Sequence, residues 1–170
     1  MFSPGIKIKQ GKRVSLPLCP AGLYARLIVN EEKPTPPEPV NTRQFLTDLR
    51  EAVLRLHKAL LESERASYEA TFGKIQSPYQ FLKLLTSDPW FAWLRPMSQL
   101  IAAIDEALDE PGPLALENMN AFVNQVKVLI VPTEGGEGFS RHYDEAMQRD
   151  PDVVFAHAAV AKLLRQKTGK

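Results

Sequence analysis

Residues 41–73 carry an unbroken helical pattern in the sequence NTRQFLTDLREAVLRLHKALLESERASYEATFG. Apolar or small residues recur there at alternating spacings of four and three, the heptad pattern of a helix that packs against other helices. This seam consists of Phe45, Leu49, Ala52, Leu56, Ala59, Ser63, Ala66 and Ala70, and it is widened on one side by Leu46, Val53 and Leu60. Asn41 or Thr42 can cap the helix, and Gly73 suits its C-terminal end. The pattern predicts a helix roughly 45 Å long at 1.5 Å per residue.

Capping residues and prolines divide the following sequence into further helical segments. Residues 77–78 and 88–89 each place a capping side chain before a proline, and Gln80 completes a capping box. Pro96 lies inside the next apolar pattern and should kink or break that helix. The later helices are expected to begin near Ala115, at a Ser140 cap and at Asp150. Because the loops are short, we predict an all-α fold, an up-and-down helical bundle of about four to six helices.

Residues 1–40 differ from the rest of the chain in composition. They hold seven of the 14 prolines, with six basic and three acidic side chains. Apolar and polar residues alternate briefly there, which is a weak strand pattern, and four prolines within residues 34–39 favour a polyproline II spacer. We therefore predict a basic, proline-rich N-terminal arm and linker over residues 1–40, irregular or weakly β and partly disordered. The helical bundle domain is predicted over residues 41–170.

The overall composition excludes several classes of protein. The 170 residues include 21 basic and 20 acidic side chains, so nucleic acid is not an expected partner. The single cysteine, Cys19, cannot form an internal disulfide. No apolar run approaches the ~20 residues of a transmembrane segment, and early lysines interrupt any signal-peptide core. These features predict a cytoplasmic protein.

Two histidines are the candidates for cofactor binding. His57 lies between Val53 and Leu60 on the first helix, and His157 lies on the apolar seam of the last. Such a pair could hold haem or a metal, but the sequence lacks the Glu-x-x-His motif of metal-binding bundles. A hydrogen-bonded core histidine is the favoured alternative for each. We expect no metal site, no cofactor and no catalytic residue.

The aromatic cluster Trp90-Phe91-Ala92-Trp93 gives the candidates for partner contact. Tryptophan is enriched among the residues that dominate binding energy in protein interfaces. Trp90, Phe91 and Trp93 are therefore candidate contact residues. The favoured alternative is that they anchor the core beside Pro96.

The segments Phe45 to Leu61 and Asp88 to Pro96, the latter reading DPWFAWLRP, carry a resemblance to other proteins. On these residues the chain resembles a group of small bacterial all-helical proteins to which no activity is assigned. The resemblance covers about residues 41–167. It implies a bacterial, cytoplasmic origin and supplies no activity to transfer.

Three functional hypotheses remain open. The leading one is a non-catalytic protein-interaction or oligomerisation module, because a long heptad seam is combined with no convergent catalytic set. Its partner would be another protein or a second copy of this chain. The alternative is a sensor bundle that binds haem or a small molecule through His57, His157, Met97 and Met119. The second alternative, which the sequence favours least, is an enzyme of unknown class using Glu62, Glu64, Asp105 and Glu106.

Overall fold

The computed structural model describes residues 41–133 and 136–168 of the chain. Over these residues it contains six α-helices, one 3-10 helix and no β-strand, which confirms the predicted all-α bundle. The predicted arm and linker over residues 1–40 lies outside the described residues. Across the described part, no helix has the length and apolar character needed to cross a membrane.

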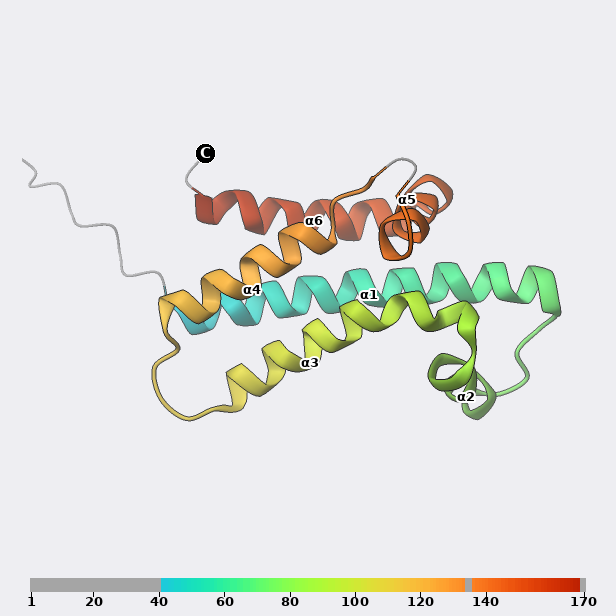
Figure 1. The fold of residues 1–170 in the computed structure, drawn as a ribbon, viewed down its shortest axis with the longest axis horizontal. Helices are drawn as coiled ribbons and strands as arrows, with labels where there is room; N and C mark the ends of the chain where they lie inside the picture. The colour runs from blue at the N-terminus through green and yellow to red at the C-terminus, as the bar shows by residue number, and fades with distance from the viewer. Residues whose placement is uncertain (1–40, 134–135, 169–170) are drawn as a thin grey trace, which may run out of the picture. The chain divides into compact units, whose positions relative to one another are not determined.

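The long helix predicted from residue 41 lies at the centre of the bundle. The elements are α1 (Thr42–Phe72), α2 (Pro78–Ser87), η1 (Pro89–Leu94), α3 (Arg95–Asp109), α4 (Leu116–Leu129), α5 (Phe139–Arg149) and α6 (Pro151–Thr168). In Figure 1, α1 runs between α3 on one side and α6 on the other, and it packs more extensively against these two helices than against any other. The short helix α2 lies near the C-terminal end of α1, and the α3–α4 connection lies near its N-terminal end (Figure 1).

Both ends of α1 lie where the sequence predicts them. Asn41 Oδ1 accepts a hydrogen bond from the Gln44 backbone N–H at 3.2 Å, which satisfies one of the unpaired donors of the first turn. Gly73 ends the helix with a φ of 92°, a conformation that strongly favours glycine. Local sequence chemistry therefore sets the length of α1.

The start of α2 uses the predicted capping pair with one difference. Ser77 Oγ accepts a hydrogen bond from the Gln80 backbone N–H at 3.2 Å, as the capping box requires. The Gln80 side chain accepts its bond from the backbone N–H of Gln76 at 2.8 Å instead of from Ser77. The reciprocal bond is thus displaced by one residue, and it helps to hold the loop between α1 and α2.

Pro96 ends one helical element and begins another. The preceding residues form the 3-10 helix η1, whose start is capped by Asp88: its Oδ1 accepts from the Trp90 backbone N–H at 2.9 Å. Helix α3 begins at Arg95 and places Pro96 in its first turn, where the missing N–H would have no intrahelical partner in any case. The predicted break is confirmed.

The predicted Ser140 cap of α5 is wrong. Gly138 precedes the helix with a φ of 58°, so the chain turns into α5 two residues earlier than predicted. Ser140 lies in the first helical turn, and its side chain makes no capping hydrogen bond. A glycine can adopt the left-handed backbone conformation of this turn without the steric cost that a serine would meet.

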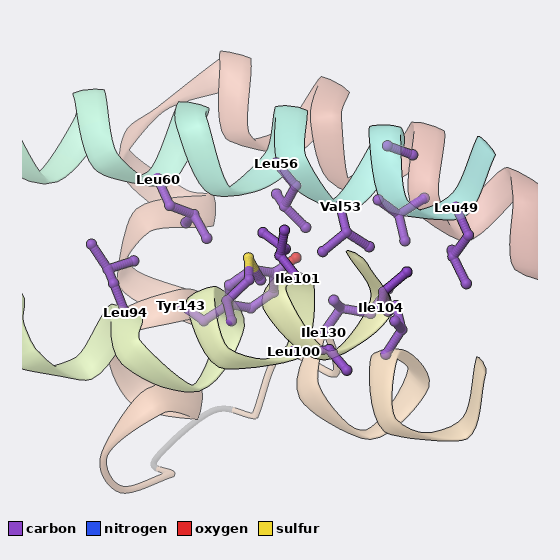
Figure 2. Packing of buried hydrophobic residues seen from close by; sticks show 14 of the residues in the cluster. Leu49, Val53, Leu56, Leu60, Leu94, Leu100, Ile101, Ile104, Ile130 and Tyr143 are labelled. Atoms are coloured by element: carbon purple, nitrogen blue, oxygen red, sulfur yellow. The ribbon is translucent and has the colours of Figure 1, made fainter. Parts of the chain in front are cut away.

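The core is one cluster of apolar side chains gathered around α1 (Figure 2). The helices α3, α4, α5 and α6 all contribute to it. Its largest fully buried side chains are Tyr143, Phe91, Leu46, Leu49, Leu56, Leu60, Met97, Ile104, Met119, Val53, Val126 and Val153.

The buried stripe of α1 differs from the predicted seam. Ala66 and Ala70 are exposed, whereas Leu46, Val53 and Leu60, expected at the edge of the seam, are fully buried. Leucine and valine remove more apolar area from water than alanine does, so the free energy of burial favours the face that carries them. The heptad spacing is preserved, but the stripe is displaced toward these larger side chains.

Arg43 ties the start of α1 to the loop that follows α3. Its Nη2 donates to the backbone carbonyls of Glu110 and Gly112 at 2.9 and 2.8 Å, and its Nη1 donates to the carbonyl of Leu108. The last carbonyls of a helix lack intrahelical donors, so one guanidinium satisfies groups that would otherwise need water. This contact fixes the α3–α4 connection beside the first turn of α1.

We expect Leu56→Ala to lower the free energy of unfolding by about 2–5 kcal/mol, the range for a buried leucine that leaves a cavity. Leu56 is 0% exposed, whereas Leu54 on the same helix is 39% exposed. Leu54→Ala is therefore the matched control and should cost less than about 1 kcal/mol. Urea unfolding of both variants measures the difference, and equal losses would contradict the assigned core face of α1.

Candidate functional site

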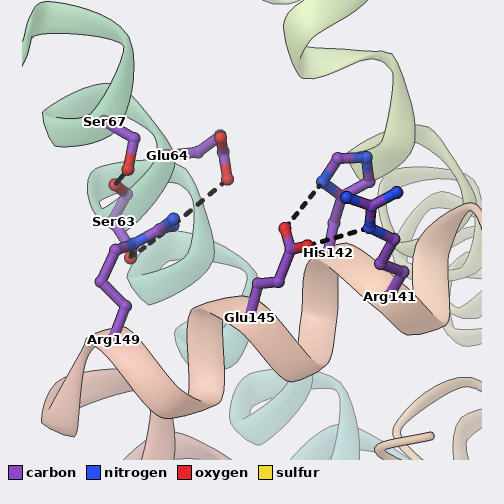
Figure 3. Close-up of polar contacts among 7 residues, drawn as sticks. All are labelled: Ser63, Glu64, Ser67, Arg141, His142, Glu145 and Arg149. Carbon is purple, nitrogen blue, oxygen red and sulfur yellow. Dashed lines mark hydrogen bonds and ion pairs between the residues drawn. The ribbon is translucent and has the colours of Figure 1, made fainter. Parts of the chain in front are cut away.

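A cavity of about 310 Å³ lies between α1, η1 and α5, and we call it the α1–α5 pocket. Figure 3 shows side chains that α1 and α5 present to each other at this place. The residues that line the pocket are Glu64, Ser67, Thr71, Pro89, Trp90, His142, Glu145 and Arg149.

The two helices supply their polar residues at the same spacing. Helix α1 contributes positions 64, 67 and 71, and α5 contributes positions 142, 145 and 149. Positions i, i+3 and i+7 share one face of an α-helix, so two polar stripes face the cavity. This site was not predicted from the sequence. The pattern that could have indicated it is the group of charged residues Glu62, Glu64 and Arg65, which interrupts the apolar pattern of α1.

Glu64 and Arg149 form the central pair of the pocket. Glu64 is only 6% exposed, and its Oε2 lies 3.3 Å from Arg149 Nη2. The guanidinium also donates to Ser63 Oγ from Nη2 at 3.1 Å and from Nε at 3.3 Å. A buried carboxylate is costly without a partner, so this arginine offsets much of the cost of burying Glu64.

Glu145 forms the outer part of the polar network. Its carboxylate accepts from Arg141 Nε at 2.9 Å and lies 3.6 Å from His142 Nδ1 (Figure 3). The hydrogen bond from Arg141 lowers the pKa of Glu145, and the positive charges nearby act in the same direction. The His142 ring stacks on Trp93 with ring centroids 5.3 Å apart. The pocket therefore joins a charged stripe to the aromatic cluster of η1.

The predicted contact residues lie mostly in the core. Phe91 and Trp93 are 1% and 8% exposed, and Trp90 is half-buried with its ring edge-on to Tyr68 and Phe72. These positions fit the core-anchor alternative for Phe91 and Trp93, and contact of this cluster with a partner stays a prediction. The indole Nε1 atoms of both tryptophans are buried without a hydrogen-bond partner among the described residues.

The two candidate histidines have separate partners on different helices. His57 Nε2 lies 2.9 Å from Ser98 Oγ on α3, and His157 Nδ1 lies 2.7 Å from the Tyr143 hydroxyl on α5. Burial raises the pKa of Tyr143 above its usual value of 10.0. Both rings are half-buried and hydrogen-bonded, each to a different helix, and the structure does not join them in one site. Among the described residues, no group of three or more His, Cys, Asp or Glu side chains could hold a metal ion.

The four carboxylates considered for an enzyme do not converge. Glu64 lines the α1–α5 pocket, whereas Glu62 borders a different groove beside α2. Asp105 accepts hydrogen bonds from Arg50 Nε and Nη2 at 2.6 and 3.1 Å. Glu106 borders a further groove between α3 and α4. This arrangement supplies no pair of buried acids for general acid–base chemistry.

The second notable feature is an exposed apolar surface at the C-terminal end of α1 and on α2, which we call the α2 surface. None of the ten residues of α2, all of them described, is fully buried. Phe72, Tyr79 and Leu82 are 62%, 77% and 59% exposed. Residues 70–87 include two lysines and no acidic residue. Exposed large apolar side chains in such a group are typical of interaction sites.

The third feature is the α3–α4 groove, a depression of about 370 Å³. Its walls are formed by Ala103, Glu106, Ala107, Glu110, Asn118, Ala121, Phe122 and Gln125. Residues 96–126 include five acidic side chains and no lysine or arginine. Neither Glu106 nor Glu110 forms a side-chain ion pair with another described residue. The groove is therefore acidic and is floored partly by small alanine side chains.

Comparison with known proteins adds no assignment to these surfaces. No protein-family model, no curated protein and no solved structure matches the chain.

We expect the protein to lose stability as the pH falls below about 6.5, the usual pKa of histidine. Burial lowers the pKa of His57, and burial together with the charge of Arg165 lowers the pKa of His157. The unfolded chain then binds protons that the folded chain does not, so acid favours unfolding. The full contribution of both neutral rings is present above the unfolded pKa.

Urea unfolding at about pH 7.5 and about pH 5.5 measures this effect, and NMR titration of the ring protons assigns it. His57→Gln and His157→Gln should each reduce the loss between the two pH values. Histidine titration midpoints above the usual value for both rings would contradict the burial argument.

Proposed function

We propose that the protein is a non-catalytic interaction module that associates with itself, the α2 surface of one copy docking in the α3–α4 groove of the next. The observation that carries this proposal is that one chain has both a helix with exposed apolar side chains and a lysine, and an acidic groove lined by alanine. One face of α2 packs against the bundle, and the opposite face, with Tyr79, Leu82 and Lys83, is exposed. The apolar area and positive charge of this face complement the small side chains and negative charge of the groove.

The shapes support the pairing of the two surfaces. Tyr79 and Leu82 project large apolar area from α2, and the groove wall offers Ala103, Ala107 and Ala121. Small residues let a neighbouring helix approach closely, so large side chains on the docking helix can fill the space above them. Burial of this area provides the favourable free energy of association.

The charges support the same pairing of the α2 surface with the α3–α4 groove. Lys83 on α2 forms no ion pair with another described residue, and the same holds for Glu106 and Glu110 in the groove. Opposite charges that meet across an interface favour the correct register and speed association. The reverse pairings, α2 with α2 or groove with groove, bring like charges together and are disfavoured.

The positions of the surfaces make the association head-to-tail. The α2 surface lies near the C-terminal end of α1, and the α3–α4 connection is bound by Arg43 near the N-terminal end (Figure 1). An interface between two different surfaces of one chain repeats until it closes as a ring or extends as a filament. A ten-residue helix buries a small area, so we expect a transient interface with a dissociation constant of about micromolar or weaker.

We expect Lys83→Glu to abolish self-association, because it places a negative charge opposite Glu106 and Glu110. Glu106→Lys should do the same from the other side of the interface, and the double variant Lys83→Glu/Glu106→Lys should restore association. Sedimentation velocity over a concentration series, at an ionic strength of about 0.05 M to limit screening, measures all three. Lys58→Glu, which reverses an exposed charge on α1, is the matched control and should associate like the unaltered chain.

A chain that sediments as a monomer at every concentration overturns the proposal. Association that survives both single reversals would place the interface elsewhere and would also overturn it. Circular dichroism and urea unfolding of each variant separate loss of association from loss of folding.

A further inference from the structure

The α1–α5 pocket contains a carboxylate and a guanidinium side by side, and each has atoms that form no hydrogen bond within the described residues. Glu64 Oε2 and Arg149 Nη2 lie 3.3 Å apart. Glu64 Oε1 and Arg149 Nη1 make no hydrogen bond to any described residue. A buried carboxylate and a guanidinium are strong hydrogen-bonding groups, so each can take a further partner.

The hydroxyl groups of Ser67 and Thr71 on the α1 wall can accept hydrogen bonds from a ligand, but their own protons are already donated to backbone carbonyls. The Ser67 hydroxyl donates to the carbonyl of Ser63 at 3.3 Å, and the Thr71 hydroxyl donates to the carbonyl of Ser67 at 3.0 Å. Their protons are therefore engaged, and their oxygen lone pairs remain available. Ser67 lies one helical turn from Glu64, so the two side chains together favour a ligand group rich in N–H donors.

The opposite wall offers donors and an apolar surface. Arg149 Nη1 can donate to a carboxylate, and Pro89 and Trp90 border the cavity with apolar area. The α1 wall thus presents hydrogen-bond acceptors, whereas the α5 wall presents the free Nη1 donors of Arg149 beside the Glu145 carboxylate, which is already bonded to Arg141.

We propose that this pocket binds a small free amino acid, with its ammonium group at Glu64 and Ser67 and its carboxylate at Arg149. The ammonium group has three N–H donors and no acceptor, and the carboxylate has only acceptors. One carbon joins the two groups, so their charged atoms lie roughly 3 Å apart, comparable to the separation of the Glu64 and Arg149 charges. A cavity of about 310 Å³ accommodates such a molecule together with water.

Other ligand classes fit these walls less well. A phosphate or dicarboxylate carries more negative charge than an amino acid and has no ammonium group, so nothing on it would offset the repulsion from Glu64 and Glu145. A divalent cation would meet the guanidinium of Arg149 next to its carboxylate ligand, and three clustered metal ligands are absent from the described residues. An apolar ligand would cover Glu64 and Arg149 without giving either charge a new hydrogen bond.

Isothermal titration calorimetry with glycine, L-alanine, L-serine and L-threonine tests the proposal. At least one of the four should bind about tenfold more tightly than either ethylamine or propionate, which each carry only one of the two charged groups. Glu64→Gln keeps the shape of the side chain but removes its charge, and it should weaken binding by about tenfold or more. Glu51→Gln, on the exposed face of the same helix, is the matched control and should bind like the unaltered chain.

The absence of binding by all four amino acids overturns the proposal. Equal binding of ethylamine or propionate overturns it as well, because it removes the need for one of the charged groups. Unchanged binding by a folded Glu64→Gln variant places the ligand elsewhere and has the same consequence. The Lys83→Glu variant should bind the amino acid normally, so failure of self-association and failure of ligand binding are distinguished.

Discussion

The apolar face of α1 is the surface on which the bundle is assembled, because the most extensive helix–helix contacts of the described residues are made with it. Helices α3, α4, α5 and α6 all pack against it, and α6 and α3 do so most extensively. Leu49, Leu56 and Leu60 are fully buried along this face. A substitution that weakens the face therefore weakens several helix contacts at once, and the bundle should unfold as one cooperative unit.

The same helix changes in chemistry along its length. Its first two thirds bury leucine and valine, whereas Ser63 and Glu64 are buried in its last third and require polar partners from α5. The Arg149 side chain is 41% exposed whereas Glu64 is buried, so only one member of the pair is removed from water. Both groups keep hydrogen-bonding capacity toward the pocket, which is why we infer a ligand there.

The fold followed from local sequence signals, and the site did not. Asn41, Gly73 and Ser77 act at helix ends as predicted, because capping depends on residues that are neighbours in the chain. The displaced seam of α1 and the glycine turn before α5 depend on what packs against each helix, and periodicity alone does not carry that information. Glu64 and Arg149 are 85 residues apart, so only the folded chain brings them together.

The unbroken helix α1 fixes the distance between the two ends of the bundle. The helix has 31 residues without a break, which corresponds to about 46 Å at 1.5 Å per residue. Its first turn contacts the α3–α4 loop through Arg43, and its last turns line the pocket and lead into α2. A helix cannot lengthen without breaking its own hydrogen bonds, so the two ends of the bundle are held at a constant separation. In any assembly joined through those ends, the length of this one helix would set a constant part of the repeat distance, and each inserted residue would add about 1.5 Å to it.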